Sequence, residues 1–232
     1  MSSTEAINNF VEGYAQLFKT GQRSPILRRP DEYGMEYEDI LFPSLDGTVM
    51  QGWFIPALNS QKLIIANHPM TCNRYEFPGH LEEYGGFAAA WAENATIHAM
   101  THFPEYFKAM KAMILLQAVS GHAFVEQGAI NPGLDKETTV AAFDKRIHEL
   151  TGFWLAELTP LPLAKNVTVP TLFAQVRRDT LIDTSDSQQI FDALGSKEKK
   201  MVWIEDTDRR FDGYNYFAKE PVEMLNWFKL YI

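Results

Sequence analysis

The sequence predicts an α/β fold with a mostly parallel, doubly wound sheet of about six strands flanked by helices. Two observations carry this prediction. Short apolar runs typical of strands alternate with helix-forming segments along most of the chain. The first two strand-like segments, 36–43 and 49–56, are separated by Asp46-Gly47, a turn signal. They predict an antiparallel hairpin at one edge of an otherwise parallel sheet.

The expected helices are recognised by apolar spacing, composition and terminal signals. Residues 4–19 repeat apolar side chains every three or four positions, as an amphipathic helix does. Asp135 is placed to cap a helix within the helix-forming stretch 122–160. Further helices are expected over 87–102 and 185–194, and from Pro221 onward.

The expected strands of the main sheet are brief apolar runs. The run 62–67 is uninterrupted, which is the pattern of a strand buried on both faces. The runs 111–119, 170–177 and 200–205 are the other strands that we expect.

The chain length suits one α/β domain with a single sizeable core. We expect residues 1–35 to form an N-terminal helical extension and residues 36–232 to form the α/β domain. Within that domain, 122–160 is expected to be a helical cap over a ligand pocket. The helix 4–19 is expected to pack on the body of the protein or, alternatively, to make a dimer contact or a lid.

Composition restricts the partners and the compartment. The formal net charge of −9 argues against binding nucleic acid or an anionic membrane, because both require a basic surface. The single cysteine, Cys72, excludes an internal disulfide and suits a reducing compartment. The first residues lack the pattern of a signal peptide, and no apolar run is long enough to span a bilayer. We therefore expect a cytoplasmic protein. Its expected partner is a small-molecule substrate or ligand, no cofactor is expected, and a homodimer is one arrangement that the sequence allows.

The order of these segments resembles the α/β-hydrolase superfamily, in its ester- or acyl-hydrolase form. The hairpin is similar to the first two strands of that fold, and the run from Asn67 through His68 to Met70 is similar to the turn after its third strand. The resemblance implies that backbone N–H groups of this turn help to form an oxyanion hole. Asp179, just past the strand 170–177, matches the acid of the catalytic triad.

Three departures from the family pattern bear on activity. No G-x-S-x-G or G-x-C-x-G elbow occurs, so no residue matches the family's nucleophile. The loop after the strand 200–205 should supply the catalytic histidine, but it runs from Asp206 to Tyr214 without one. Only about 43 residues separate His68 from Ala112, too few for the family's usual series of strands and helices. The chain thus resembles a shortened hydrolase fold with an internal deletion.

Three groups besides Asp179 are candidates for catalysis. Cys72 lies four residues beyond His68, and a thiolate beside an imidazole is a usable nucleophile; the alternative is a buried, inert thiol. Ser120 ends a central strand on the side where ligands bind in open α/β sheets; the alternative is a turn serine. His122 could act as a base or contact the substrate, or it could face solvent and pair with a carboxylate.

The loop that contains Arg209, Arg210 and Tyr214 is the most distinctive run in the chain. The two arginines could bind a carboxylate or phosphate of the substrate through bidentate hydrogen bonds. The alternative is a structural loop in which one arginine pairs with a nearby aspartate such as Asp179. Such a pairing would stabilise the ionised carboxylate and prevent it from serving as an acid. Asn67 and Met70 complete the expected substrate contacts.

A metal site is not predicted. His98 and His102 are one helical turn apart, but the H-E-x-x-H pattern is absent and no third ligand is evident.

Three functions are consistent with these observations. The first is a hydrolase for a small ester or acyl compound, weak or inactive in this form because the nucleophile is not matched. The second is a non-catalytic, small-molecule-binding or dimeric interaction module on the same scaffold. The third is a cysteine-based enzyme that uses Cys72 and His68.

Overall fold

The computed structural model of the protein describes residues 3–20, 25–44, 46–57, 59–68, 73–74 and 92–232. The helices within these residues are α1 (Ser3–Thr20), α2 (Ala92–His102), α3 (Gly121–Ile130), α4 (Lys136–Thr151), α5 (Thr184–Ala193), α6 (Arg210–Gly213), α7 (Tyr216–Lys219) and α8 (Pro221–Tyr231). The strands are β1 (Glu38–Pro43), β2 (Val49–Phe54), β3 (Met113–Leu116), β4 (Thr171–Val176) and β5 (Lys199–Ile204).

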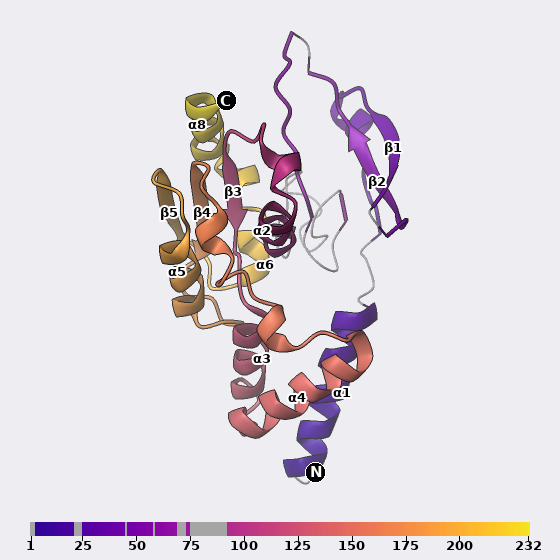
Figure 1. The fold of residues 1–232 in the computed structure, drawn as a ribbon, viewed down its shortest axis with the longest axis vertical. Helices are drawn as coiled ribbons and strands as arrows, with labels where there is room; N and C mark the ends of the chain where they lie inside the picture. The colour runs from indigo at the N-terminus through magenta and orange to yellow at the C-terminus, as the bar shows by residue number, and fades with distance from the viewer. Residues whose placement is uncertain (1–2, 21–24, 45, 58, 69–72, 75–91) are drawn as a thin grey trace.

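The strands β3, β4 and β5 form a parallel sheet in that order (Figure 1). Leu116 of β3 lies opposite Ala174 of β4, which lies opposite Val202 of β5. Parallel neighbours need long crossover connections. Here α3 and α4 connect β3 to β4, and α5 connects β4 to β5. All three strands therefore end at the same edge of the sheet, where the loops that follow them meet.

Helices cover both faces of this sheet, because alternate side chains of each strand point to opposite sides. On one face, Leu172, Ala174 and Val176 of β4 pack against α6, α7 and α8. On the other face, Phe173 packs in a second cluster with α2 and α5. Every residue of β4 is buried, as a central parallel strand requires. The predicted α/β arrangement with helices on both faces is thus confirmed.

The first helix packs against the helices between β3 and β4. Ile7, Val11 and Ala15 of α1 share a core cluster with Phe143 and Ile147 of α4. The stretch 122–160 is largely helical, as expected, and Asp135 caps α4 by accepting a hydrogen bond of 2.9 Å from the backbone N–H of Thr138. Its role as a cap over a pocket, and the division into 1–35 and 36–232, stay predictions.

The hairpin is confirmed, with β1 and β2 antiparallel and Ile40 opposite Gly52. It forms a separate two-stranded sheet, and in the described part of the chain no strand joins it to β3–β4–β5. The expectation of a buried strand over 62–67 is wrong, because this segment is exposed and has no strand pairing. A single sheet of six strands is therefore not confirmed. The expected deletion falls mostly outside the described residues and stays a prediction.

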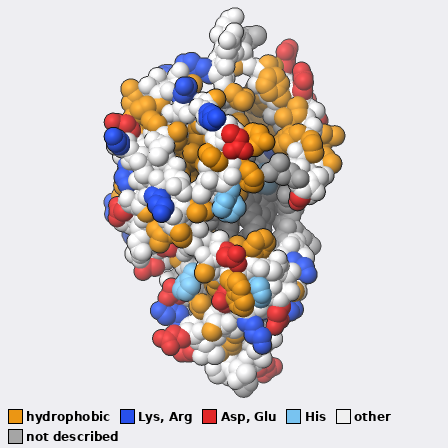
Figure 2. All heavy atoms as spheres, viewed as in Figure 1, with side chains coloured by type: hydrophobic (Ala, Val, Ile, Leu, Met, Phe, Trp, Pro, Cys, Tyr) orange, Lys and Arg blue, Asp and Glu red, His pale blue; other side chains and the backbone are white. Residues whose placement is uncertain are grey.

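Large apolar side chains are exposed on the hairpin and on the segment 62–67. Leu41 is 68% exposed, Val49 63% and Ile65 73%. Figure 2 shows hydrophobic side chains gathered over the part of the molecule where Figure 1 places β1 and β2. Among the helices that the structure describes, none has the length and apolarity needed to cross a bilayer.

Candidate functional site

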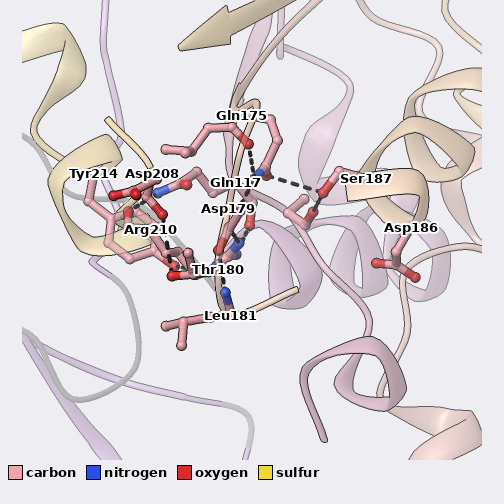
Figure 3. A network of polar contacts seen from close by, with 12 residues as sticks. Gln117, Gln175, Asp179, Thr180, Leu181, Asp186, Ser187, Asp208, Arg210 and Tyr214 are labelled. Atoms are coloured by element: carbon pink, nitrogen blue, oxygen red, sulfur yellow. Dashed lines mark hydrogen bonds and ion pairs between the residues drawn. The ribbon is translucent and has the colours of Figure 1, made fainter. Parts of the chain in front are cut away.

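A buried polar network lies at the carboxyl ends of β3 and β4 (Figure 3). We call it the carboxyl-end network. Ligands bind at this edge in open α/β sheets, so it is the place to look for a functional site. Its members come from the ends of both strands, from the start of α5 and from α6: Gln117, Gln175, Asp179, Ser187, Arg210 and Tyr214.

Asp179 is at the centre of the network, with a fully buried side chain (0% exposed). Its Oδ2 accepts hydrogen bonds from Arg210 at 2.8 Å and from Gln175 at 3.1 Å. Its Oδ1 accepts one from the backbone N–H of Leu181 at 2.8 Å. Both carboxylate oxygens are therefore engaged by groups of the protein itself.

Arg210 begins α6, in the segment that follows β5, and its side chain is 1% exposed. Besides the ion pair with Asp179, its Nε donates to the hydroxyl of Tyr214 at 2.9 Å, and its guanidinium also donates to the backbone carbonyl of Gln117. Burial lowers the pKa of Arg210, but Tyr214 and Asp179 outweigh it, so the pKa lies above its ordinary value. The guanidinium stays protonated and cannot accept a proton as a general base.

Gln117 directly follows β3 and has a positive φ of 65°. This left-handed backbone conformation is uncommon for residues other than glycine. The side-chain Nε2 donates to the backbone carbonyl of Arg210 at 2.6 Å. A Cβ on Gly213 would lie 2.9 Å from that Nε2 and 2.5 Å from Val176, so only glycine lets α6 approach the sheet this closely. The Gln117 Oε1 is buried and has no hydrogen-bond partner among the described residues.

Ser120 takes part in a second polar cluster near the first. Its hydroxyl donates to Asp186 at 2.6 Å, and its backbone N–H donates to the other oxygen of Asp186 at 2.8 Å. The same hydroxyl accepts from the N–H of Ala123 at 3.2 Å and so caps α3. These bonds fasten the start of α3 to the start of α5, which agrees with a structural serine.

The remaining predicted site residues are exposed, half-buried or outside the described residues. Met70 and Cys72 lie outside the described residues. Asn67 is exposed, with its side-chain amide 3.5 Å from the hydroxyl of Thr96, and His68 is half-buried. His122 is exposed, 3.6 Å from Glu126, and Arg209 is exposed, 3.8 Å from Asp212. The ion pair and hydrogen bonds of the network join three of the ten predicted site residues, namely Asp179, Arg210 and Tyr214. The predicted alternative in which an arginine pairs with Asp179 is confirmed, with Arg210 as that arginine.

Sequence reasoning missed Gln117, Gln175, Asp186 and Ser187. The single hydroxyl hydrogen of Ser187 is shared between the carbonyl of Ala118 at 3.0 Å and the side-chain oxygen of Gln175 at 3.1 Å, which extends the network from β4 to α5. Gln117 and Gln175 each lie in or directly after a run of apolar strand residues. A polar residue in such a run must find a partner when it is buried, and this signal could have identified both.

The fold is similar to that of solved esterases. The esterase Pf2001 of Pyrococcus furiosus aligns with 90% of this chain and 96% of its own, at 14% identity and a TM-score of 0.64. A second crystal form of that esterase gives a TM-score of 0.64 at 15% identity, with 90% of this chain and 95% of the other covered. The esterase domain of a Rhodothermus marinus protein gives 0.50 at 14% identity, with 82% and 98% covered. The chain has an α/β-hydrolase fold. No family model matches it, and no curated protein matches it in sequence.

Asp179 lies in the loop after β4, and Arg210 begins α6 in the segment after β5. The geometry therefore joins a buried carboxylate to a permanent cation at the carboxyl edge of the sheet. Such a pair can anchor three segments of chain, but it cannot transfer protons at neutral pH.

Proposed function

We propose that this protein is an esterase-like α/β-hydrolase that recognises small ester or acyl compounds and hydrolyses them weakly or not at all. The similarity to esterases supports the scaffold. One observation carries the proposal on activity: the buried ion pair between Asp179 and Arg210.

The argument follows from the task of the triad acid. That carboxylate orients a neutral imidazole and stabilises the imidazolium when a proton moves. Asp179 instead neutralises a guanidinium, and its oxygens already accept hydrogen bonds from Gln175 and Leu181. Because Arg210 keeps its proton, the pair cannot activate a nucleophile. Binding and an oxyanion hole alone still accelerate ester hydrolysis by about 10³–10⁴ over water.

The test is hydrolysis of p-nitrophenyl acetate and butyrate, with and without a serine-directed fluorophosphonate. We expect slow hydrolysis that the fluorophosphonate does not abolish. Ser120→Ala is expected to leave the rate unchanged, because that hydroxyl is bonded to a carboxylate. Robust turnover that the fluorophosphonate abolishes would overturn the proposal. Fast alkylation of Cys72 near neutral pH, with loss of turnover, would favour the cysteine-based alternative.

A dimeric interaction module is the second candidate, favoured by the exposed apolar side chains of the hairpin and of 62–67. Contiguous apolar patches on a soluble protein commonly mark interaction surfaces. The test is sedimentation velocity over a hundredfold concentration range. We expect dimers in the wild-type chain and monomers in Leu41→Asp and Ile65→Asp. Val222→Asp, at a residue 64% exposed on α8, is the matched control and should stay dimeric.

A further inference from the structure

Two imidazoles lie side by side on α2, the helix that packs beside β3 in Figure 1. The ring centroids of His98 and His102 are 4.2 Å apart, and the ring planes are inclined by 37°. Residues four apart on a helix project from the same face, one turn above the other. Both histidines are exposed to solvent.

The helix that carries the two imidazoles is anchored on its other side. Ile97 (0% exposed) and Met100 (9% exposed) belong to the core cluster that contains Met113 and Leu115 of β3. The side chain of Asn94 donates to the carbonyl of Val119 at 2.7 Å and fixes the first turn. The two histidines therefore project from a backbone that the core holds in place, which limits the entropy lost when they share a ligand.

No other group of the described chain forms a hydrogen bond or ion pair with either imidazole. Their nitrogen lone pairs are thus available to an external partner. Neutral imidazole is the most frequent protein ligand for transition metals, and two histidines at this spacing form the helical half of several metal sites.

We propose that His98 and His102 form a two-ligand surface site for a borderline divalent transition-metal ion, with water in the remaining coordination positions. The exposed rings can rotate so that one nitrogen of each comes within about 2.0–2.1 Å of the same ion. Imidazole ligands select copper, nickel and zinc, whereas calcium and magnesium prefer oxygen. Affinity should follow the usual order for such ligands, with copper(II) bound most tightly.

The proposed site is not a structural zinc site, which the sequence does not predict. A structural zinc site needs four protein ligands, and the described residues hold no cluster of three or more candidate ligands. A pair of histidines instead gives an open, exchangeable site that bridges one turn of the helix. A bound ion should stabilise α2, since it binds the folded helix better than the unfolded chain.

Isothermal titration of the full chain with copper(II), nickel(II), zinc(II) and, for comparison, magnesium tests the proposal. We expect one strong transition-metal site per chain and no magnesium binding at the same concentrations. His98→Gln and His102→Gln should each weaken copper binding at least tenfold. His122→Gln is the matched control, because His122 is also exposed on a helix but has a carboxylate as its neighbour at four residues. That variant should bind like the wild type.

Electron paramagnetic resonance of the copper-loaded chain gives a second readout. Two equatorial nitrogens are expected in the wild type and one in either single variant, and circular dichroism shows whether each variant is folded. Copper affinity and nitrogen count that are unchanged in folded His98→Gln and His102→Gln would overturn the proposal. Magnesium binding at the same site would also overturn it.

Discussion

Replacing Arg210 by methionine should remove a large part of the stability of the chain. The substitution keeps the side-chain volume but deletes the hydrogen bonds of the guanidinium to Asp179, Tyr214 and the carbonyl of Gln117. The Asp179 carboxylate, 0% exposed, is then left as a buried charge with only neutral donors. Breaking a buried ion pair on one side costs about 3–5 kcal/mol. For a chain of this size, that loss lowers the Tm by about 6–20 °C.

The assay is urea unfolding followed by circular dichroism, with the Tm as a second measure. The control is the double variant Arg210→Met/Asp179→Leu. Replacing both charges removes the uncompensated buried carboxylate, so the double variant should recover part of the loss, while the Gln117 carbonyl and the Leu181 N–H remain without these partners. A loss below about 1 kcal/mol for Arg210→Met would match a solvent-exposed pair and refute the reasoning. A double variant as unstable as the single one would refute it as well.

Three further predictions follow from other contacts. The hydrogen bond from Arg146 to Glu12, together with one from Gln16, holds the pKa of Glu12 at about 2. The ionised Glu12 therefore stabilises the folded state above about pH 4.5, and this stabilisation is lost as the pH falls toward 2. Over this pH range, the Tm of the wild type should therefore fall more steeply than the Tm of Glu12→Gln. Scanning calorimetry at several pH values measures both, and parallel curves of Tm against pH would contradict the prediction. Gly195→Ala would place a Cβ 2.0 Å from a backbone carbonyl oxygen, so we expect a loss of about 3 kcal/mol in urea unfolding, and a neutral effect would contradict this packing. Ser120→Ala removes the cap of α3 and should lower the free energy of unfolding by about 1–2 kcal/mol in urea unfolding. A free energy of unfolding equal to that of the wild type would contradict this prediction.

Most helices and the parallel strands could be predicted from the sequence, because each carries a local pattern. The apolar spacing within 4–19 identified α1, the cap at Asp135 identified α4, and the unbroken apolar run at 170–177 identified β4. These signals depend only on neighbouring residues, so they remain reliable when the tertiary arrangement is unknown.

The segment 62–67 shows why the remainder could not be predicted. An apolar run is compatible with a strand, but a strand exists only when another strand pairs with it, and that partner is non-local. In the described chain this segment has no such partner, and Leu63 and Ile65 are 67% and 73% exposed. Hydrophobicity alone does not supply the hydrogen bonds that a sheet requires.

The candidate site was predictable in part. The position of Asp179 just after a strand identifies it as a candidate. Its pairing with Arg210 is one of two alternatives for the arginine loop, because the two residues are 31 positions apart and no local pattern connects them. No periodic pattern relates residues so far apart. Gln117 was not recognised, because its role depends on a left-handed backbone and on the approach of Gly213, and both follow from the assembled fold.

The packing of α1 against α4 has a consequence for synthesis on the ribosome. Ile7, Val11 and Ala15 emerge early, but their partners Phe143 and Ile147 are more than a hundred residues later. At about 5–20 residues per second, the nascent chain displays this apolar stripe for about 7–25 s before these two partners exist. We therefore expect a chaperone that acts on nascent chains to bind the first helix early. Deleting that helix should shorten the association, and ribosome profiling of chaperone-bound nascent chains would measure it.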